Sequence, residues 1–349
     1  MSDTVRLGII GAGSYTRSRM LPNFLNIPGV HVAAVANRSV ESARKVTEKF
    51  HIADALDDWR ALLERDDIDA VLIGTPPYAH REIAVAAMDA GKHVLCQTRM
   101  ATTLEEARAM SRKATETGRR AALVRPSRYI TAGRFLKHLL ETGYAGNVRQ
   151  VFCYRLIPDY ADPSAPLGRR QDAELYGETN CLYLGYCWDV LRDWFGEPKR
   201  VLAHAVNFTP RRPAGPDGPL VDVRTPEAVT AIAEMESGAS VTSVQSGLAH
   251  FGVDRIEVYG DRGTLVYEAD SDRLLGARAG SENLAPLDVP PEFADSWTVE
   301  RDFIRMVRGE IEQMFLTFEA GVENMAYLDA CHRSALEGRW VDQGAALDP

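Results

Sequence analysis

The sequence predicts two domains: an α/β domain built on a doubly wound parallel sheet, followed by an α+β domain with a large, mainly antiparallel sheet. Three observations support this fold class. The chain opens with a buried-strand pattern that breaks into a glycine turn, and short apolar runs then alternate with helical runs up to residue 124. Beyond residue 126, alternating apolar–polar runs follow each other with few helices between them. We therefore place the domains at residues 1–126 and 127–349.

The first strand and its turn come from residues 5–17, VRLGIIGAGSYTR. The apolar, partly β-branched run suits a strand that is buried on both faces. Gly11 and Gly13 allow a tight turn and let the backbone approach a pyrophosphate at the start of the next helix. Thr16 stands where the G-x-G-x-x-G pattern has its third glycine. A plain strand–helix turn therefore stays open as the alternative.

The next elements complete the parallel sheet. We expect strands at residues 30–36, 70–74, 93–96 and 121–124, and helices at 39–50, 57–65, 78–90 and 103–117. Ligands of such sheets bind beyond the carboxyl ends of the strands. This predicted ligand edge carries residues 11–17, 37–39, 75–80 and 97–99.

The second half of the sequence has a different pattern of predicted elements. We expect strands at residues 148–156, 201–208, 228–235, 240–247, 255–259 and 264–267, and helices at 131–141, 187–195, 298–308 and 321–338. Residues 158–177 and 210–226 are rich in proline, glycine and charge. They are either mobile surface loops or lids over a cleft.

Composition excludes several classes of protein. The net charge of −9 argues against sequence-independent binding to nucleic acid or to an anionic membrane. No apolar run is long enough to span a bilayer, and the charged N-terminus leads us to expect no signal peptide. The five cysteines have no metal-ligand spacing. We expect a cytoplasmic protein with reduced thiols and no metal.

Several motifs resemble the glucose–fructose oxidoreductase, inositol dehydrogenase and rhizopine-catabolism (Gfo/Idh/MocA) family. They are GAGSYTR after the first strand, TPPYAHREIAVAAMDAGKHVLC at 75–96, GYAGNV at 143–148, IEVYGDRGTL at 256–265 and SALEGRWV at 334–341. The resemblance implies an N-terminal Rossmann domain that holds a nicotinamide cofactor. It also implies a C-terminal sheet that often forms an oligomer interface, and oxidation or reduction of hydroxyl-bearing carbons of sugars, cyclitols and polyols.

The sequence departs from this family at two motifs. The family usually carries Glu-Lys-Pro after GKHVLC, where its lysine contacts the cofactor ribose and a substrate hydroxyl, but this chain has Gln97-Thr98-Arg99. Thr98 carries no charge, and Arg99 is a poor base. In the helix before WFGEP, Asp189 takes the place of the family's later Asp, Tyr186 that of its His and Leu182 that of its earlier Asp.

Tyr186 is the best candidate for proton transfer. A phenol is a weak base unless a nearby cation, such as Arg99, Arg128 or an oxidised nicotinamide, favours its anion. The alternative is that Tyr186 only packs or binds substrate, with Cys187 and Trp188 as core neighbours. Asp189 either orients Tyr186 or a sugar hydroxyl, or pairs with Arg192.

The cofactor prediction favours NADP over NAD. No acid follows the second strand, where one would bind a ribose 2′-hydroxyl, whereas Arg38 and Ser39 suit a 2′-phosphate. The alternative is that Ser39 is only a helix N-cap and that Arg38 is solvated. We expect His80 to support the cofactor site structurally, and Arg125 and Arg128 to bind substrate oxygens or acids.

The predicted site therefore has three groups of residues. The catalytic candidates are Tyr186, Asp189, Arg99 and Thr98; the cofactor candidates are Gly11, Gly13, Ser14, Tyr15, Thr16, Asn37, Arg38, Ser39, Thr75, Pro76, His80, Gln97 and Thr98; the substrate candidates are Arg99, Arg125, Arg128 and Tyr186. We predict a carbohydrate-like substrate and a homo-oligomer, a dimer or tetramer, formed through the second-domain sheet. Two alternatives stay open: transient oxidation in an elimination or glycoside cleavage, and a catalytically inactive sensor or partner subunit.

Overall fold

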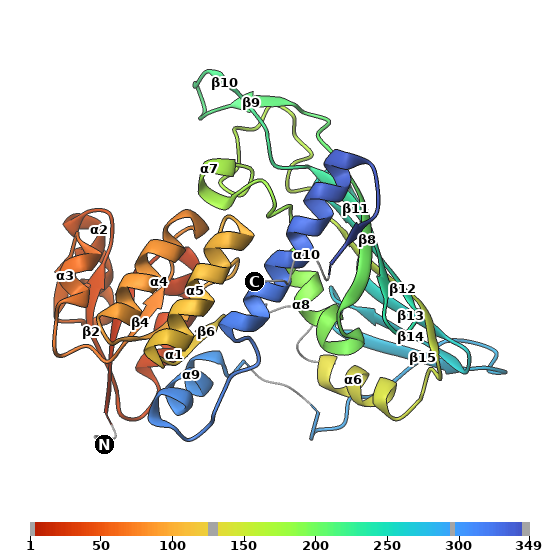
Figure 1. The fold of residues 1–349 in the computed structure, drawn as a ribbon, viewed down its shortest axis with the longest axis horizontal. Coiled ribbons are helices and arrows are strands. Elements are labelled where there is room, and N and C mark those ends of the chain that lie inside the picture. Colours follow the sequence, from red (N-terminus) through yellow and green to blue (C-terminus); the bar gives the residue numbers. More distant parts are fainter. Residues whose placement is uncertain (1–3, 125–131, 294–296, 344–349) are drawn as a thin grey trace. The chain divides into compact units, whose positions relative to one another are not determined.

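The structure is a computed structural model that describes residues 4–124, 132–293 and 297–343 (Figure 1). The chain forms two compact units, residues 1–125 with 298–325 and residues 126–297 with 326–349. The first unit thus takes in residues 298–325, a segment that the sequence prediction assigns to the second domain. The Leu123 amide donates to the Leu316 carbonyl at 2.9 Å, and an antiparallel bridge joins Ala122 to Thr317. These backbone contacts hold the segment beside the first sheet.

The described part of the first unit contains a six-stranded sheet in the order β3-β2-β1-β4-β5-β6, in which every pair is parallel. Its strands are β1 (Val5–Ile10), β2 (Val30–Ala36), β3 (Asp54–Leu56), β4 (Ala70–Ile73), β5 (His93–Cys96) and β6 (Ala121–Leu123). All four residues of β4 are buried, as expected of a parallel strand that is covered on both faces. The predicted doubly wound fold is confirmed.

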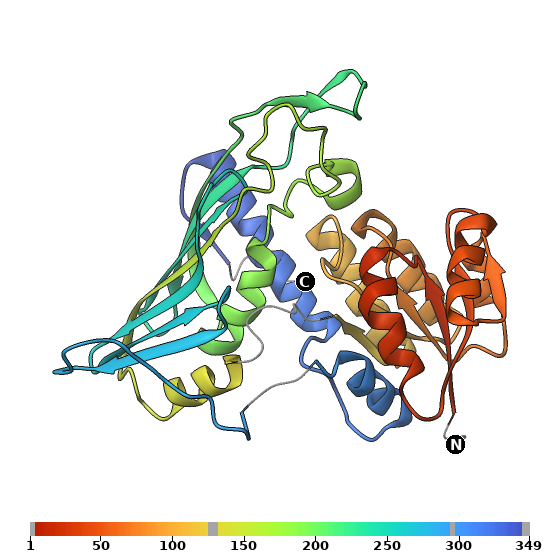
Figure 2. The same cartoon turned by 180° about the vertical axis from the view of Figure 1, so that it is seen from behind.

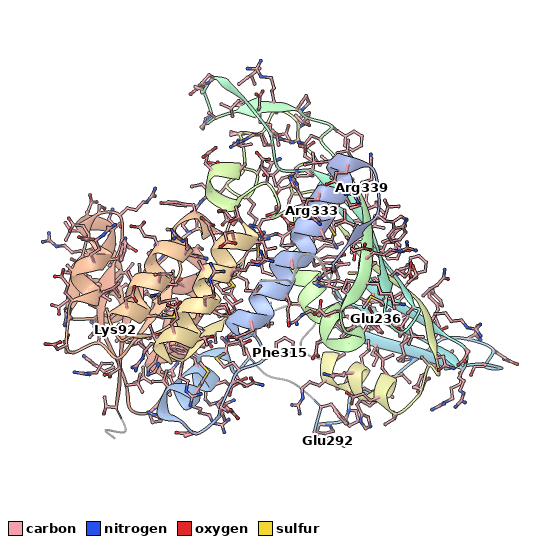
Figure 3. All side chains as sticks on the ribbon, viewed as in Figure 1. Lys92, Glu236, Glu292, Phe315, Arg333 and Arg339 are labelled. Carbon is pink, nitrogen blue, oxygen red and sulfur yellow. The ribbon has the colours of Figure 1, made fainter. Side chains whose placement is uncertain are left out.

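Helices cover both faces of this sheet. They are η1 (Thr16–Met20), α1 (Leu21–Leu25), α2 (Val40–Phe50), α3 (Trp59–Leu63), η2 (Pro77–Ala79), α4 (His80–Asp89), α5 (Leu104–Thr117) and α9 (Val299–Arg308). In Figure 1, α4 and α5 lie side by side on the near face, and Figure 2 shows α1 and α9 on the other. Lys92, marked in Figure 3, lies between α4 and β5, and its ammonium donates to the Arg65 carbonyl at 2.7 Å.

The described part of the second unit contains a nine-stranded sheet in the order β16-β15-β14-β13-β7-β12-β11-β8-β17. Its strands are β7 (Val148–Leu156), β8 (Pro198–Val206), β11 (Ala228–Met235), β12 (Ser240–Ser246), β13 (Asp254–Gly260), β14 (Gly263–Glu268), β15 (Arg273–Arg278), β16 (Ala285–Pro286) and β17 (Val341–Asp342). Only β7 and β12 pair in parallel among these described strands. The predicted, mainly antiparallel sheet is confirmed.

The helices of the second unit lie on one face of this sheet (Figures 1 and 2). They are α6 (Gly133–Glu141), α7 (Ala173–Tyr176), α8 (Leu184–Phe195) and the part of α10 (Phe318–Glu337) beyond residue 325. Trp188 of α8 stacks on Tyr327 of α10 with ring centroids 3.8 Å apart. Along β12, buried residues alternate with half-buried ones, so the helix-covered face carries the core.

The two proline- and glycine-rich stretches are tied to each other. The second contains a small hairpin of β9 (Arg211–Pro213) and β10 (Leu220–Asp222). Arg212, 1% exposed, pairs with Glu227, 0% exposed, at 2.9 Å. Arg212 also donates to the carbonyls of Tyr160 and Asp162 in the first stretch. The two stretches are therefore joined by hydrogen bonds of Arg212, which is itself buried in the ion pair with Glu227, while a role as lids stays a prediction.

Candidate functional site

The turn after β1 is shaped by its two glycines. Gly11 has a φ of +84°, and a Cβ there would lie 2.7 Å from the Thr75 backbone nitrogen, so no side chain fits. At Gly13, the nearest atom to an added Cβ is the Gly74 carbonyl oxygen at 3.8 Å. The space beside Gly13 is therefore open. This turn offers exposed backbone at a helix start, the arrangement that binds a pyrophosphate.

Asn37 connects this turn to the end of β2. Its side-chain oxygen accepts a hydrogen bond from the Ala12 amide at 2.8 Å. Ser14, exposed, and Tyr15, half-buried, are already helical and lead into η1. Asn37 thus holds the turn in place, a role that the sequence prediction did not assign to it.

The two unusual residues of the cofactor motifs contact each other. Thr16 is fully buried, and its hydroxyl accepts a hydrogen bond from Gln97 Nε2 at 3.1 Å. A Cβ on Gly74, which follows β4, would lie 2.5 Å from the Thr16 hydroxyl oxygen and 3.5 Å from Gln97 Nε2. Thr16 and Gln97 therefore fill the space between the ends of β1, β4 and β5.

His80 holds together the loops that follow β4 and β5. Its Nε2 lies 2.7 Å from the Thr75 carbonyl oxygen, and its Nδ1 lies 3.0 Å from the Arg99 and 3.1 Å from the Met100 carbonyl oxygen. Burial lowers the pKa of His80, so the neutral imidazole is the favoured form. Its contacts are to backbone carbonyls, which suits a residue that positions these loops.

Thr98 and Arg99 are both engaged with the protein. The Thr98 hydroxyl donates to the Val124 carbonyl at 3.1 Å, at the end of β6. Arg99 is only 4% exposed, and the Thr98–Arg99 peptide bond is cis. Of the two, Thr98 is the less buried.

Arg38 and Ser39 follow β2 and are both exposed. The Ser39 hydroxyl accepts a hydrogen bond from the Ser42 amide at 3.2 Å, so it caps α2. Arg125 and Arg128, the other predicted arginines, lie outside the described residues.

Tyr186 lies in the first turn of α8, in the second unit, and is half-buried. Its ring centroid is 5.9 Å from that of Tyr183. Asp189, one turn later, is buried, and Arg192 pairs with Glu197 at 3.3 Å.

Cys187 and Trp188, which follow Tyr186, belong to the core. Cys187 accepts a hydrogen bond from Gln245 Nε2 at 3.4 Å, and Trp188 is fully buried. Both are thus core residues, as the alternative reading of Tyr186 expected of its neighbours.

Arg170 is a residue that the sequence reasoning missed. Its Nη1 donates to the Tyr183 hydroxyl. Burial opposes its charge, but electrostatic interaction with Tyr183, Tyr186, Tyr176 and Tyr160 raises its pKa overall. The one available signal was a pair of arginines, 169 and 170, in a candidate lid. The structure thus places a cation beside Tyr183, with its guanidinium carbon 4.8 Å from the centre of that ring, and this cation is not one of those predicted.

The first unit fits a dinucleotide on two observations. The open side of Gly13 provides room, and the Thr75 hydroxyl oxygen is buried with no hydrogen-bond partner among the described residues. Within the described ranges, no cluster of three or more His, Cys, Asp and Glu side chains could hold a metal ion. None of the described helices combines the length and apolar composition that crossing a membrane needs.

Comparisons with known proteins agree with this geometry. Residues 5–124 match the model of an oxidoreductase family with an NAD-binding Rossmann fold, and residues 134–266 match the Gfo/Idh/MocA C-terminal domain. Levoglucosan dehydrogenase of Pseudarthrobacter phenanthrenivorans is 27% identical over 80% of this chain and 77% of its own length. A dTDP-3,4-didehydro-2,6-dideoxy-α-D-glucose 3-reductase of Saccharopolyspora spinosa is 31% identical over 46% of this chain and 48% of its own length.

Solved structures share the fold of the whole chain. Levoglucosan dehydrogenase in complex with NADH and levoglucosan gives a TM-score of 0.86 at 24% identity, covering 97% of this chain and 99% of that one. An oxidoreductase domain protein from Kribbella flavida gives 0.84 at 25% identity with the same coverage. With both halves of the chain matched to one family and the glycine turn in place, the chain belongs to the Gfo/Idh/MocA oxidoreductase family, and its first unit has the NAD(P)-binding Rossmann fold.

Proposed function

We propose that this protein transfers a hydride between a nicotinamide cofactor and a hydroxyl-bearing carbon of a sugar, cyclitol or related polyol. The observation that carries the proposal is the open glycine turn beside the buried, unpartnered Thr75 hydroxyl. The names of two relatives, a levoglucosan dehydrogenase and a dTDP-sugar reductase, support a carbohydrate-like substrate.

The first unit supplies the cofactor contacts in this proposal. Gly11 and Gly13 make room for the pyrophosphate, Arg38 binds a 2′-phosphate, and Thr75, Pro76, Gln97 and Thr98 lie toward the nicotinamide end. When bound, the cofactor accepts or supplies the hydride. The absence of an acid in Asn37-Arg38-Ser39 and the exposure of Arg38 both favour NADP over NAD.

Tyr186 moves the substrate proton in this proposal. Hydride transfer from an alcohol requires a group that takes the hydroxyl proton, and Tyr186 stands at the family's His position. Asp189 and Arg99 position the substrate. We expect the Tyr186→Phe variant to lose at least about 100-fold in kcat, the usual effect of removing a general acid–base group. Full turnover with normal cofactor binding would reject this role.

The first experiment is a titration of the protein with NADH and with NADPH, followed by energy transfer from its five tryptophans to the reduced ring. Tighter binding of NADPH supports Arg38 at the phosphate, and tighter binding of NADH reverses the cofactor choice. A screen of sugars and cyclitols with the better cofactor then tests the reaction. If folded protein, freed of bound cofactor, binds neither, the proposal fails.

A catalytically inactive sensor is the second candidate. The observation in its favour is that the Thr98 hydroxyl, at the family's lysine position, donates to the Val124 carbonyl. Cofactor binding without turnover of any alcohol or ketone in the screen would support this candidate.

We also propose that the open face of the second-unit sheet forms an oligomer interface. Apolar side chains on that face are half-buried, among them Phe152 and Tyr154, whose rings lie 6.1 Å apart and nearly parallel. Sedimentation of the wild type and of Phe152→Asp tests this: the variant should be the smaller species.

A further inference from the structure

Arg170 carries a charge that no carboxylate neutralises directly. It is half-buried in the loop before α7, and its guanidinium carbon lies 4.8 Å from the centre of the Tyr183 ring. In the part of the chain that the structure describes, no carboxylate forms an ion pair with it. Partly buried charges are normally paired, because removing a charge from water is costly.

The neighbouring charged residues do not neutralise the charge of Arg170. Arg155 stacks on the same Tyr183 ring at 4.1 Å, but it forms a buried ion pair with Asp254. Asp159 is exposed and accepts a hydrogen bond from the Tyr183 hydroxyl at 3.2 Å. The hydroxyl of Tyr183 thus lies between Arg170 and Asp159. The Arg155–Asp254 pair is neutral overall, and Asp159 reaches Arg170 only through the Tyr183 hydroxyl.

The guanidinium of Arg170 also has N–H groups that donate to no described residue. An arginine offers five N–H groups, and within the described residues the one hydrogen bond of this side chain goes from Nη1 to Tyr183. None of its nitrogens is among the fully buried, unpartnered atoms of the described chain, so the other donors remain in contact with solvent. They are accessible to a ligand.

The surroundings of Arg170 suit a hydroxylated ligand. The Tyr183 ring lies against the guanidinium, and the ring centroid of Tyr186 is 5.9 Å from that of Tyr183. A phenol hydroxyl both donates and accepts hydrogen bonds, as sugar hydroxyls do. A cation among phenols therefore combines one anion-binding group with several partners for hydroxyls.

We infer that Arg170 binds a carboxylate of the substrate, so that the substrate is a sugar acid, a polyol carrying one carboxylate. This inference rests on the proposed function and specifies its substrate class. A carboxylate matches a single planar guanidinium in charge and in its two oxygens. A phosphate carries about two charges at neutral pH and is less well matched, because the second arginine here is already paired with Asp254.

The test compares sugars that differ at one carbon. Turnover is measured with the cofactor that binds more tightly. The substrates are glucose, galactose and mannose, each as the neutral sugar, as the uronate and as the 6-phosphate. We expect a uronate to be preferred over its neutral sugar, and Arg170→Gln to lower kcat/KM for that uronate by about tenfold to a hundredfold, through KM. The same variant should change the neutral sugar less than about threefold.

Arg169→Gln is the matched control, because it removes the same charge from the adjacent, exposed residue. It should leave both substrates unchanged, and Arg170→Lys should recover part of the uronate activity. Thermal unfolding of each variant identifies any loss of fold. Equal losses on both substrates in Arg170→Gln, with a shifted pH profile of kcat, would mean that Arg170 acts through Tyr186 and would overturn the inference. Preference for the phosphate would overturn the carboxylate assignment.

A binding measurement separates this inference from the proposed function. If no sugar in the panel is turned over, the proposed function fails, and calorimetry with the three uronates in the presence of the cofactor that binds more tightly decides the inference alone. Binding of a uronate to the wild type that is lost in Arg170→Gln and kept in Arg169→Gln supports the carboxylate site. No uronate binding to the wild type overturns it.

Discussion

Replacing Glu227 by glutamine should strongly destabilise the second unit. One carboxylate oxygen of Glu227 accepts from Arg212 Nη2 at 2.9 Å, and the other accepts from the Phe208 and Thr209 amides at 3.0 Å and 2.8 Å. The substitution keeps the shape of the side chain but removes its charge. It leaves a positive charge at Arg212, of which only 1% is exposed, without its counter-ion.

The size of the effect follows from this burial. Removing one partner of a buried ion pair costs about 3–5 kcal/mol. For a unit of this size, each kcal/mol lowers the melting temperature by about 2–4 °C, so we expect a decrease of about 6–20 °C.

Glu234→Gln is the matched control. Glu234, on β11, pairs with Arg200 at 2.7 Å, but their side chains are 37% and 45% exposed. An exposed pair contributes about 0–1 kcal/mol, so this variant should melt close to the wild type.

Scanning calorimetry measures both variants, and limited proteolysis shows whether loops 158–177 and 210–226 are cleaved faster in Glu227→Gln. If Glu227→Gln melts no lower than Glu234→Gln, the ion pair is accessible to water and the reasoning from burial is wrong.

Three further predictions concern the first unit. Gly13→Ala should weaken binding of both reduced cofactors by about tenfold or more in the fluorescence titration, with an unchanged melting temperature, because its Cβ enters open space. Arg38→Ala should weaken NADPH but not NADH, and the exposed Arg44→Ala should weaken neither. Burial and nearby arginines lower the pKa of His93 to about 4. In the unfolded chain the pKa of this His is about 6.5, so between these two pH values the unfolded chain binds more protons than the folded one. The free energy of unfolding should therefore fall as the pH falls from about 6.5 to about 4. His93→Asn, which keeps an acceptor for the Arg120 amide, should flatten this dependence in pH-dependent thermal unfolding.

Local signals identified most elements of the fold. Ser39 caps α2 and Gly118, with φ +61°, ends α5, as their residue types predicted. The three-residue strand β3 and the two-residue strands β16 and β17 were not predicted, since so few residues carry no periodic pattern. The six-residue strand β15 was also missed. Helices α8 and α10 begin at Leu184 and Phe318, earlier than predicted, since helix ends carry the weakest local signal.

The contacts at the candidate sites join residues far apart in the chain. In the sequence, Thr16 replaces the third glycine of the G-x-G-x-x-G pattern, and Gln97 replaces the Glu of the family's Glu-Lys-Pro. Only the structure shows that the two side chains are hydrogen-bonded to each other. Similarly, nothing near Arg170 in the sequence indicates that it donates to Tyr183.

The sequence by itself determined the order of strands and helices, the glycine turn and the family, because each depends on residue types over short spans or on motifs in a fixed order. The tertiary structure alone decided which charges are buried in ion pairs. Arg212 and Arg170 both lie in charged, proline-rich stretches, yet one is buried against Glu227 and the other is half-buried among tyrosines. The environment of a charge depends on what the fold packs around it, and residue type alone does not specify this.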